Sequence, residues 1–410
     1  MEITNHRTTR GGDADQWSTL AGHKTVLVPV HTEVYGHRLK DLLPLLHSDL
    51  RVEVTFTVAP HAFNNGVARF LTGLGANVMP WAEAVRTDFD LAIAAGSQGM
   101  EKLRAPLVRI PHGGGHMSLA RVPSGEQRGD LTAGAREPGG ITGRGYLTWD
   151  GAVVPRAVAL PHRDDLRALR RWCPEALPVA KVVGDPTYDR IAASLPFRDE
   201  YRAAIGLAPG QQLVLVPSTW GRRSSFNRLD ALLPRLLAEL PRDRFLTALL
   251  VHPNTFSRHG RYQVRAWLAD CRRAGVTVVS PDADWRAMLV AAHFVLGDFG
   301  SVTLYATMTG APIVLARYPY QDANPASPGV AMARTAPALS PTRPLADQLA
   351  YAAAEYSQRD FRRIAGRISS EPGRFARNMR ALIYEQLGLG QPAYPPTTEP
   401  VTLSASEVAL

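Results

Sequence analysis

Short apolar runs alternate along this chain with segments whose apolar residues fall on one helical face. The runs TVLVPV, QLVLVPS, FLTALLV and FVLG are typical of strands that are buried on both faces of a parallel sheet. The segments between them, such as RLDALLPRLLAEL, have the spacing of amphipathic helices. Strands that alternate with helices in this way predict an α/β fold built on doubly wound parallel sheets.

The length of 410 residues and the pattern indicate two such units, which we expect to be Rossmann-like domains that face a cleft. The strand KVVGD, from Lys181, is expected to open the second domain, and the Gly-rich stretch 124–145 is expected to be a long loop. The ends are polar or rich in Pro, Ser and Thr. We expect a disordered leader over 1–22, an N-terminal Rossmann-like domain over 23–175 and a C-terminal one over 176–345. C-terminal helices over 346–390 and a disordered tail over 391–410 are expected to follow.

Composition narrows the function classes. The two cysteines, Cys173 and Cys271, form no CxxC motif, so a disulfide scaffold and a structural zinc site are not expected, and a cytoplasmic location fits. The net charge of +9 favours an anionic small substrate or an acidic acceptor surface, and it permits peripheral contact with a membrane. No basic run or aromatic-interleaved motif indicates nucleic-acid binding.

Polar turns follow most of the expected strands, where the ligands of doubly wound sheets bind. In the turn DFGSVT, Asp298, Gly300, Ser301 and Thr303 precede or begin a helix, and we expect them to bind an anion such as a phosphate. The alternative is that Ser301 caps the helix and Asp298 caps the turn.

Histidines and arginines in other turns are candidates for catalysis. His112, in PHGGGH, is expected to be a general base for an acceptor hydroxyl, and His252 is expected to donate to a phosphate or to protonate a leaving group. Each could instead be a structural histidine. Thr219 and Arg222 could clamp a pyrophosphate, and His37 and His116 could contact an acceptor. We expect no metal and no other cofactor, because the histidines that could gather at one ion, His31, His112 and His252, lie far apart in the sequence and have no cysteine partner.

The order of these turns resembles the CDP-glycerol glycerophosphotransferase family, the teichoic-acid-type polymerases with a GT-B fold. The resemblance spans about residues 105–320. It is carried by Pro111-His112-Gly113, Gly184-Asp185-Pro186 with Asp189, Pro217-Ser218-Thr219-Trp220, His252-Pro253 and Asp298-Phe299-Gly300-Ser301-Val302. One departure is Gly300, where the family has the first serine of a pair.

The resemblance implies a histidine base at His112 and donor-phosphate contacts from His252, Ser301 and Thr303. It also implies a transferase that moves a polyol phosphate from a CDP-glycerol-like donor to an acceptor hydroxyl. Nucleotide-sugar glycosyltransferases and non-hydrolysing UDP-GlcNAc 2-epimerases share this plan, so either activity is an alternative. A nucleotide-binding protein that has lost catalysis is a third alternative.

Overall fold

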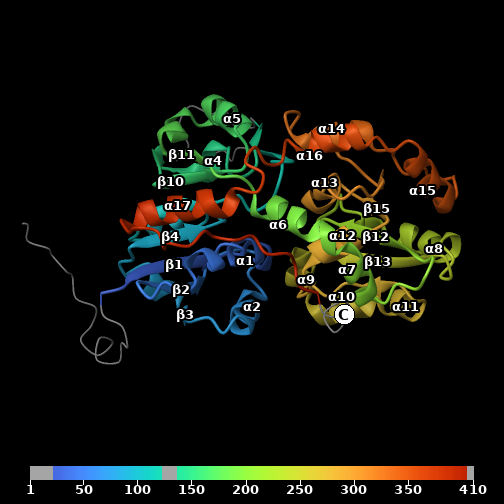
Figure 1. The fold of residues 1–410 in the computed structure, drawn as a ribbon, viewed down its shortest axis with the longest axis horizontal. Helices are drawn as coiled ribbons and strands as arrows, with labels where there is room; N and C mark the ends of the chain where they lie inside the picture. Colours follow the sequence, from blue (N-terminus) through green and yellow to red (C-terminus); the bar gives the residue numbers. More distant parts are fainter. Residues whose placement is uncertain (1–21, 122–135, 404–410) are drawn as a thin grey trace, which may run out of the picture.

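Two α/β domains lie side by side in a computed structural model that describes residues 22–121 and 136–403 (Figure 1). Residues 1–21 of the expected leader and 124–135 of the expected loop lie outside the described residues. The rest of that loop is ordered: β7 (Arg136–Pro138) pairs antiparallel with β6 (Leu119–Arg121), and α4 (Arg144–Leu147) follows. The Gly-rich composition therefore did not reveal this small hairpin.

The N-terminal domain is built on a seven-stranded parallel sheet whose order reverses between β1 and β4. Its central strands are buried along almost their whole length, which explains their continuous apolar sequences. The spatial order is β11 (Ala180–Val182), β10 (Ala157–Leu160), β5 (Leu107–Arg109), β4 (Leu91–Ala94), β1 (Lys24–Val30), β2 (Val52–Val58) and β3 (Val78–Met79).

The C-terminal domain repeats this plan with a five-stranded parallel sheet whose order reverses between β12 and β15. The spatial order is β14 (Thr277–Val278), β13 (Phe245–Val251), β12 (Gln212–Ser218), β15 (Phe294–Gly297) and β16 (Ile313–Leu315). Helices such as α8 (Leu229–Glu239) and α12 (Trp285–Ala291) bury their apolar sides against it. The expectation of two doubly wound domains is confirmed.

The expectation that the strand at Lys181 opens the second domain is wrong. β11 pairs in parallel with β10, with Val158 opposite Ala180, and so forms the edge of the N-terminal sheet. The chain reaches the core of the C-terminal domain only in α6 (Pro186–Ser194), where Ile191 is fully buried. A short apolar strand looks the same in sequence whichever sheet it joins.

The last helices connect the two domains. After α15 (Leu345–Ala354) and α16 (Gln358–Ala365) pack on the C-terminal domain, α17 (Phe375–Leu387) returns to the N-terminal domain (Figure 1). Met379 and Ile383 of α17 are fully buried in the N-terminal core. The C-terminal helices therefore cross from one domain to the other.

The expected disorder of the tail is wrong for residues 391–403. Val401 is only 3% exposed and packs in the core of the C-terminal domain. Its N–H donates to Ser194 Oγ at 2.9 Å, and its carbonyl accepts from Tyr201 Oη at 2.6 Å. The tail shows no periodic pattern of apolar residues, so the sequence does not indicate that Val401 packs in a core. Residues 404–410 lie outside the described residues.

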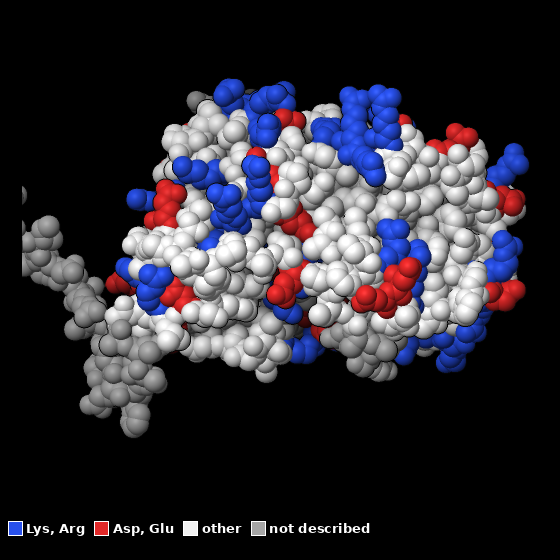
Figure 2. All heavy atoms as spheres, viewed as in Figure 1, with Lys and Arg blue, Asp and Glu red and all other residues white. Residues whose placement is uncertain are grey.

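Positive charge is unevenly distributed over the surface. In Figure 2, Lys and Arg gather along the upper edge, over α5 (Asp164–Trp172) and near α14 (Pro328–Thr335) and α16. Within the described part of the chain, no helix combines the length and the apolar character that crossing a membrane requires.

Candidate functional site

A cavity of about 120 Å³ lies where the two domains meet, and both domains line it. His112 and Gly113, which follow β5, come from the N-terminal domain together with His37 and Arg38 of α1 (Glu33–Lys40). The C-terminal domain contributes Ser218 at the end of β12, His252 after β13, and Ser301 and Tyr305 of α13 (Ser301–Ala306). The structure therefore brings together His37, His112, His252 and Ser301, four of the residues that we singled out in the sequence.

His252 is oriented by the helix that it begins. Its Nδ1 accepts the backbone N–H of Asn254 at 3.1 Å, so it caps α9 (Pro253–His259), where Pro253 takes the first helical position. Burial, and then the neighbouring His112, lower the pKa of His252 to about 3. The neutral ring must carry its proton on Nε2 if Nδ1 is an acceptor, so His252 has one N–H available for a ligand.

His112 is also held in the neutral form. Burial lowers its pKa to about 4, with further contributions from His116, Arg38 and Arg109. Its ring centroid lies 5.0 Å from that of Tyr35. Its Nδ1 is buried, and among the described residues it has no hydrogen-bond partner. A neutral imidazole can accept a proton, although a pKa this low makes it a weak base until negative charge binds nearby.

Ser301 is the first residue of α13, whereas Gly300 occupies the capping position. The simple alternative, in which the Ser301 side chain only caps the helix, does not match this arrangement. Within the described chain its hydroxyl makes no hydrogen bond, and it lines the cavity. The hydroxyl can therefore donate to a ligand.

The three glycines after His112 have a packing role. They lie against α13 of the other domain, where a Cβ built on Gly114 would be 2.8 Å from Tyr305 Oη. A Cβ on Gly115 would meet Leu304 Cδ2 at 2.5 Å, whereas one on Gly113 would lie 3.6 Å from Ser301 Oγ. The glycines thus let the His112 turn approach the helix that carries Ser301.

Asp298 holds the backbone of the turns next to the site. It is 1% exposed, and its carboxylate accepts the backbone N–H groups of Thr219 at 2.9 Å, Ser225 at 3.0 Å and Gly300 at 3.1 Å. Burial raises its pKa, which these three bonds oppose. Asp298 therefore has the capping role that was the alternative in the sequence, and the expected direct contact with a phosphate does not fit its placement. Gly300 and Thr219 are held by it and are not part of the cavity wall.

Thr303, Arg222 and His116 lie away from this cavity. Thr303 is fully buried, with its side chain against Gly297. Arg222 is exposed on a separate open cavity beside Trp220. His116 lines another cavity, where its Nε2 lies 3.2 Å from Asp165 Oδ1. Burial lowers the pKa of His116. Asp165 and Asp185 raise it, and together they outweigh burial, so the net shift of the pKa is upward.

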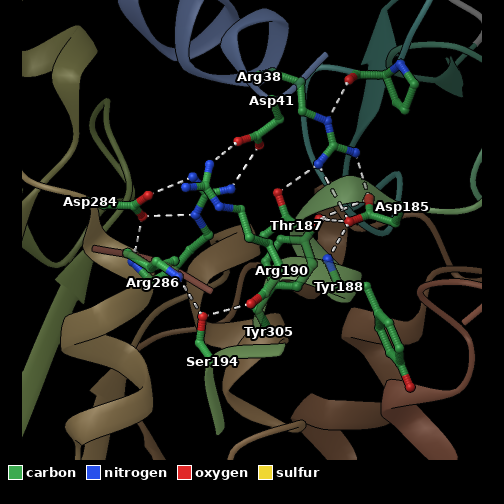
Figure 3. A network of polar contacts seen from close by, with 12 residues as sticks. Arg38, Asp41, Asp185, Thr187, Tyr188, Arg190, Ser194, Asp284, Arg286 and Tyr305 are labelled. Carbon is green, nitrogen blue, oxygen red and sulfur yellow. Dashed lines mark hydrogen bonds and ion pairs between the residues drawn. The ribbon is translucent and has the colours of Figure 1, made fainter. Parts of the chain in front are cut away.

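A buried network of charged groups joins the two domains beside the cavity (Figure 3). Arg38 of α1 donates to Asp185 at 2.5 Å and to Thr187 at 2.7 Å, and Tyr305 Oη donates to the same Asp185 carboxylate at 3.0 Å. In a second cluster, Asp41 accepts from both Arg190 and Arg286, at 2.8 and 2.7 Å.

We did not identify this network in the sequence. Arg38 and Asp41 fall on an amphipathic helix, where charged residues normally face solvent. Asp185 also caps α6, where its carboxylate accepts the N–H of Tyr188 at 2.8 Å, a local role that does not reveal its buried ion pair. Asp284 caps α12 and pairs with Arg286 at 2.6 Å. An aspartate directly before a helix is a recognisable capping signal, and it is the one local sign of this network in the sequence.

Comparison with known proteins places this geometry among solved folds. No protein-family model matches the chain, and no curated protein matches it. Among solved structures, the wall teichoic acid polymerase TagF is 13% identical, covers 89% of each chain and has a TM-score of 0.60. A TagF variant soaked with CDPG has a TM-score of 0.59 at 13% identity, covering 89% of this chain and 88% of that one.

The S. aureus MnaA–UDP structure is also similar, at 13% identity with a TM-score of 0.52, covering 92% of this chain and all of that one. The chain has a GT-B fold. At these identities the likeness extends to the fold alone, which consists of two Rossmann-like domains. The GT-B architecture that the sequence resemblance implied is confirmed.

Substitution of Gly114 by Ala tests the contact between the His112 turn and α13. The new Cβ would overlap Tyr305 Oη, so we expect Gly114→Ala to lower the free energy of unfolding by about 1–3 kcal/mol, measured by urea denaturation. Gly113→Ala is the matched control, because its Cβ has room, and its effect should stay within about 0.5 kcal/mol. Equal effects of the two variants would contradict this packing.

Removal of the Asp185 carboxylate from the buried network should lower the free energy of unfolding. Asp185→Asn leaves Arg38 buried without its ion partner, so we expect a loss of about 3–5 kcal/mol in the free energy of unfolding. Asp270→Asn is the control, because Asp270 pairs with Arg273 at the surface, where both side chains are mostly exposed. A loss for Asp185→Asn no larger than that of the control would contradict a structural role for the pair.

Proposed function

We propose that this protein is a transferase that moves a group from a nucleotide-activated donor to an acceptor hydroxyl. The observation that supports it most directly is the shared cavity, in which His112 of one domain faces His252 and Ser301 of the other. A transfer reaction needs a proton acceptor on the acceptor side and hydrogen-bond donors at the leaving group. The cavity offers both, one from each domain.

His112 is the proposed general base. The hydroxyl oxygen of the acceptor forms the new bond to the transferred group while the imidazole of His112 takes its proton. His112 is neutral and can therefore accept that proton. The negative charge of a bound donor would raise the pKa of His112 and strengthen it as a base.

His252 and Ser301 are the proposed donors to the phosphate. As the bond to the nucleotide breaks, the electron pair passes to a phosphate oxygen, which gains negative charge. The Nε2–H of His252 and the hydroxyl of Ser301 can donate hydrogen bonds to it. Arg38 also lies on the cavity wall, where its charge is paired with Asp185.

We favour a polyol phosphate as the transferred group, with CDP-glycerol as the type of donor. The order of the sequence motifs favours it, and the fold likeness to TagF is consistent with it. Cleavage would then occur at phosphorus and release CMP. One alternative is transfer of a sugar with release of a nucleoside diphosphate, and another is an epimerase-like reaction. The S. aureus MnaA–UDP structure, which has the same fold, is consistent with either. A nucleotide-binding protein without turnover is the third candidate.

Thermal unfolding with a nucleotide panel tests the proposal. CMP, CDP, CDP-glycerol, UDP, UDP-GlcNAc, GDP and TDP would be added to the wild type and to Ser301→Ala. A ligand at about 100 times its Kd stabilises the folded state by about 2.7 kcal/mol, so we expect the Tm to rise by several degrees with cytidine ligands. The shift should be smaller for Ser301→Ala and unchanged for Thr402→Ala, which removes an exposed hydroxyl elsewhere.

Each other outcome of the panel has a defined meaning. A shift with UDP, GDP or TDP alone would replace polyol-phosphate transfer by a reaction of a sugar nucleotide. Binding without release of CMP or a nucleoside diphosphate would favour the non-catalytic protein. The absence of any shift would contradict nucleotide binding in this cavity.

The acid limb of the pH profile should be displaced to low pH. The pKa of His112 is lowered to about 4, so the free enzyme keeps its base neutral until the pH falls through that value. We expect kcat/KM, measured with the donor that the panel identifies, to be retained through pH 6.5 and to fall only near pH 4. Activity recovered at pH 7 after acid exposure controls for unfolding. An acid limb near pH 6.5 would contradict a base in this environment.

A further inference from the structure

Arg109 is a buried cation that the proposed reaction does not use. It is the last residue of β5 and is 2% exposed. Its guanidinium donates to the carbonyl oxygens of Gly96 and Tyr146, the latter at 3.2 Å. Its Nε is buried and has no partner, and no carboxylate of the described residues forms an ion pair with it.

An unpaired charge in this position is unusual. Arginine is seldom fully buried unless an acidic group accompanies it, because the loss of hydration costs several kcal/mol. The two buried cations of the network between the domains, Arg38 and Arg286, each have carboxylate partners. Burial lowers the pKa of Arg109, as expected for a cation with no compensating anion. A guanidinium nevertheless stays protonated in proteins, so the charge is present.

Arg109 lines a cavity of about 470 Å³ in the N-terminal domain. Lys102 adds a second positive charge to the wall and makes no ion pair with any described residue. Glu101 also lines the cavity and pairs with neither cation. The Tyr146 ring, 4.2 Å from the Arg109 guanidinium carbon, and Trp149, 45% exposed, supply aromatic surface.

We propose that this cavity binds a small molecule that carries a carboxylate or phosphate group, with the oxyanion beside Arg109. The oxyanion would accept the N–H bonds that the protein leaves unused, and the aromatic side chains would contact the organic part. Residues 97–102, which include Lys102, and the residues around Tyr146 form its wall. The site is separate from the cavity between the domains and does not depend on the identity of the donor.

Binding of simple anions tests the site directly. Inorganic phosphate, acetate and benzoate would be titrated into the full-length protein at constant ionic strength, with chloride as the reference, and the Tm recorded. We expect at least one oxyanion to raise the Tm of the wild type in a saturable way. Phosphate alone would indicate a phosphate ligand, whereas benzoate with acetate would indicate a carboxylate.

Three variants locate the binding. Arg109→Met should abolish the saturable shift, and Lys102→Gln should weaken the apparent affinity at least threefold. Arg104→Gln is the matched control: it removes an exposed charge from the same surface but not from the cavity, and it should bind like the wild type. Lys102 is exposed, so its variant keeps the test decisive even if Arg109→Met does not fold.

Two results would overturn the proposal. One is a wild-type protein that no oxyanion stabilises more than chloride does. The other is an equal loss of affinity in Lys102→Gln and Arg104→Gln, since this would indicate a diffuse charge effect. Nucleotide binding by Lys102→Gln should equal that of the wild type, so failure of this site and failure of the donor site can be distinguished.

Discussion

The ion pair between Arg38 and Asp185 is the constraint on which the arrangement of the site depends. Arg38 belongs to α1 of the N-terminal domain, while Asp185 stands at the start of α6, where the chain leaves that domain. The same guanidinium donates from Nε to the carbonyl of Pro111 at 3.2 Å, directly before His112. Tyr305 reaches Asp185 from α13. One buried charge pair thus fixes the histidine turn, the domain crossing and the helix of Ser301.

The surroundings of His112 control its strength as a base. Burial is the main cause of its low pKa, and His116, Arg38 and Arg109 lower it further, so the free protein has a neutral but weak base. An anionic ligand close to either arginine would offset that effect. Binding and basicity are therefore coupled, because negative charge that binds near His112 raises its pKa and makes it a stronger base.

The sequence predicted the sheets well and the site in part, for physical reasons. Buried parallel strands give uninterrupted apolar runs, so the strands and the turns with His112, His252 and Ser301 could be located. Thr303 was misplaced because residues two apart on a helix point to nearly opposite sides, so it cannot share the face of Ser301. The buried ion pairs of Arg38 and Asp41 in α1 were missed because their partners lie far away in the sequence. Local sequence does not show that another segment will cover a charged residue. The edge strand β11 and the docked Val401 are likewise set by distant contacts.

The crossing of α17 makes the N-terminal domain discontinuous along the chain. Its sheet is complete once β11 at Ala180–Val182 has been made, but the helix that buries the apolar side of its core arrives only with Phe375–Leu387. Domains generally fold as units while a chain is being synthesised. Here the first domain must wait for almost the whole polypeptide, with its unfinished core exposed, while the C-terminal sheet emerges. Each domain therefore depends on a segment that is made after both sheets, α17 for the first domain and Val401 for the second.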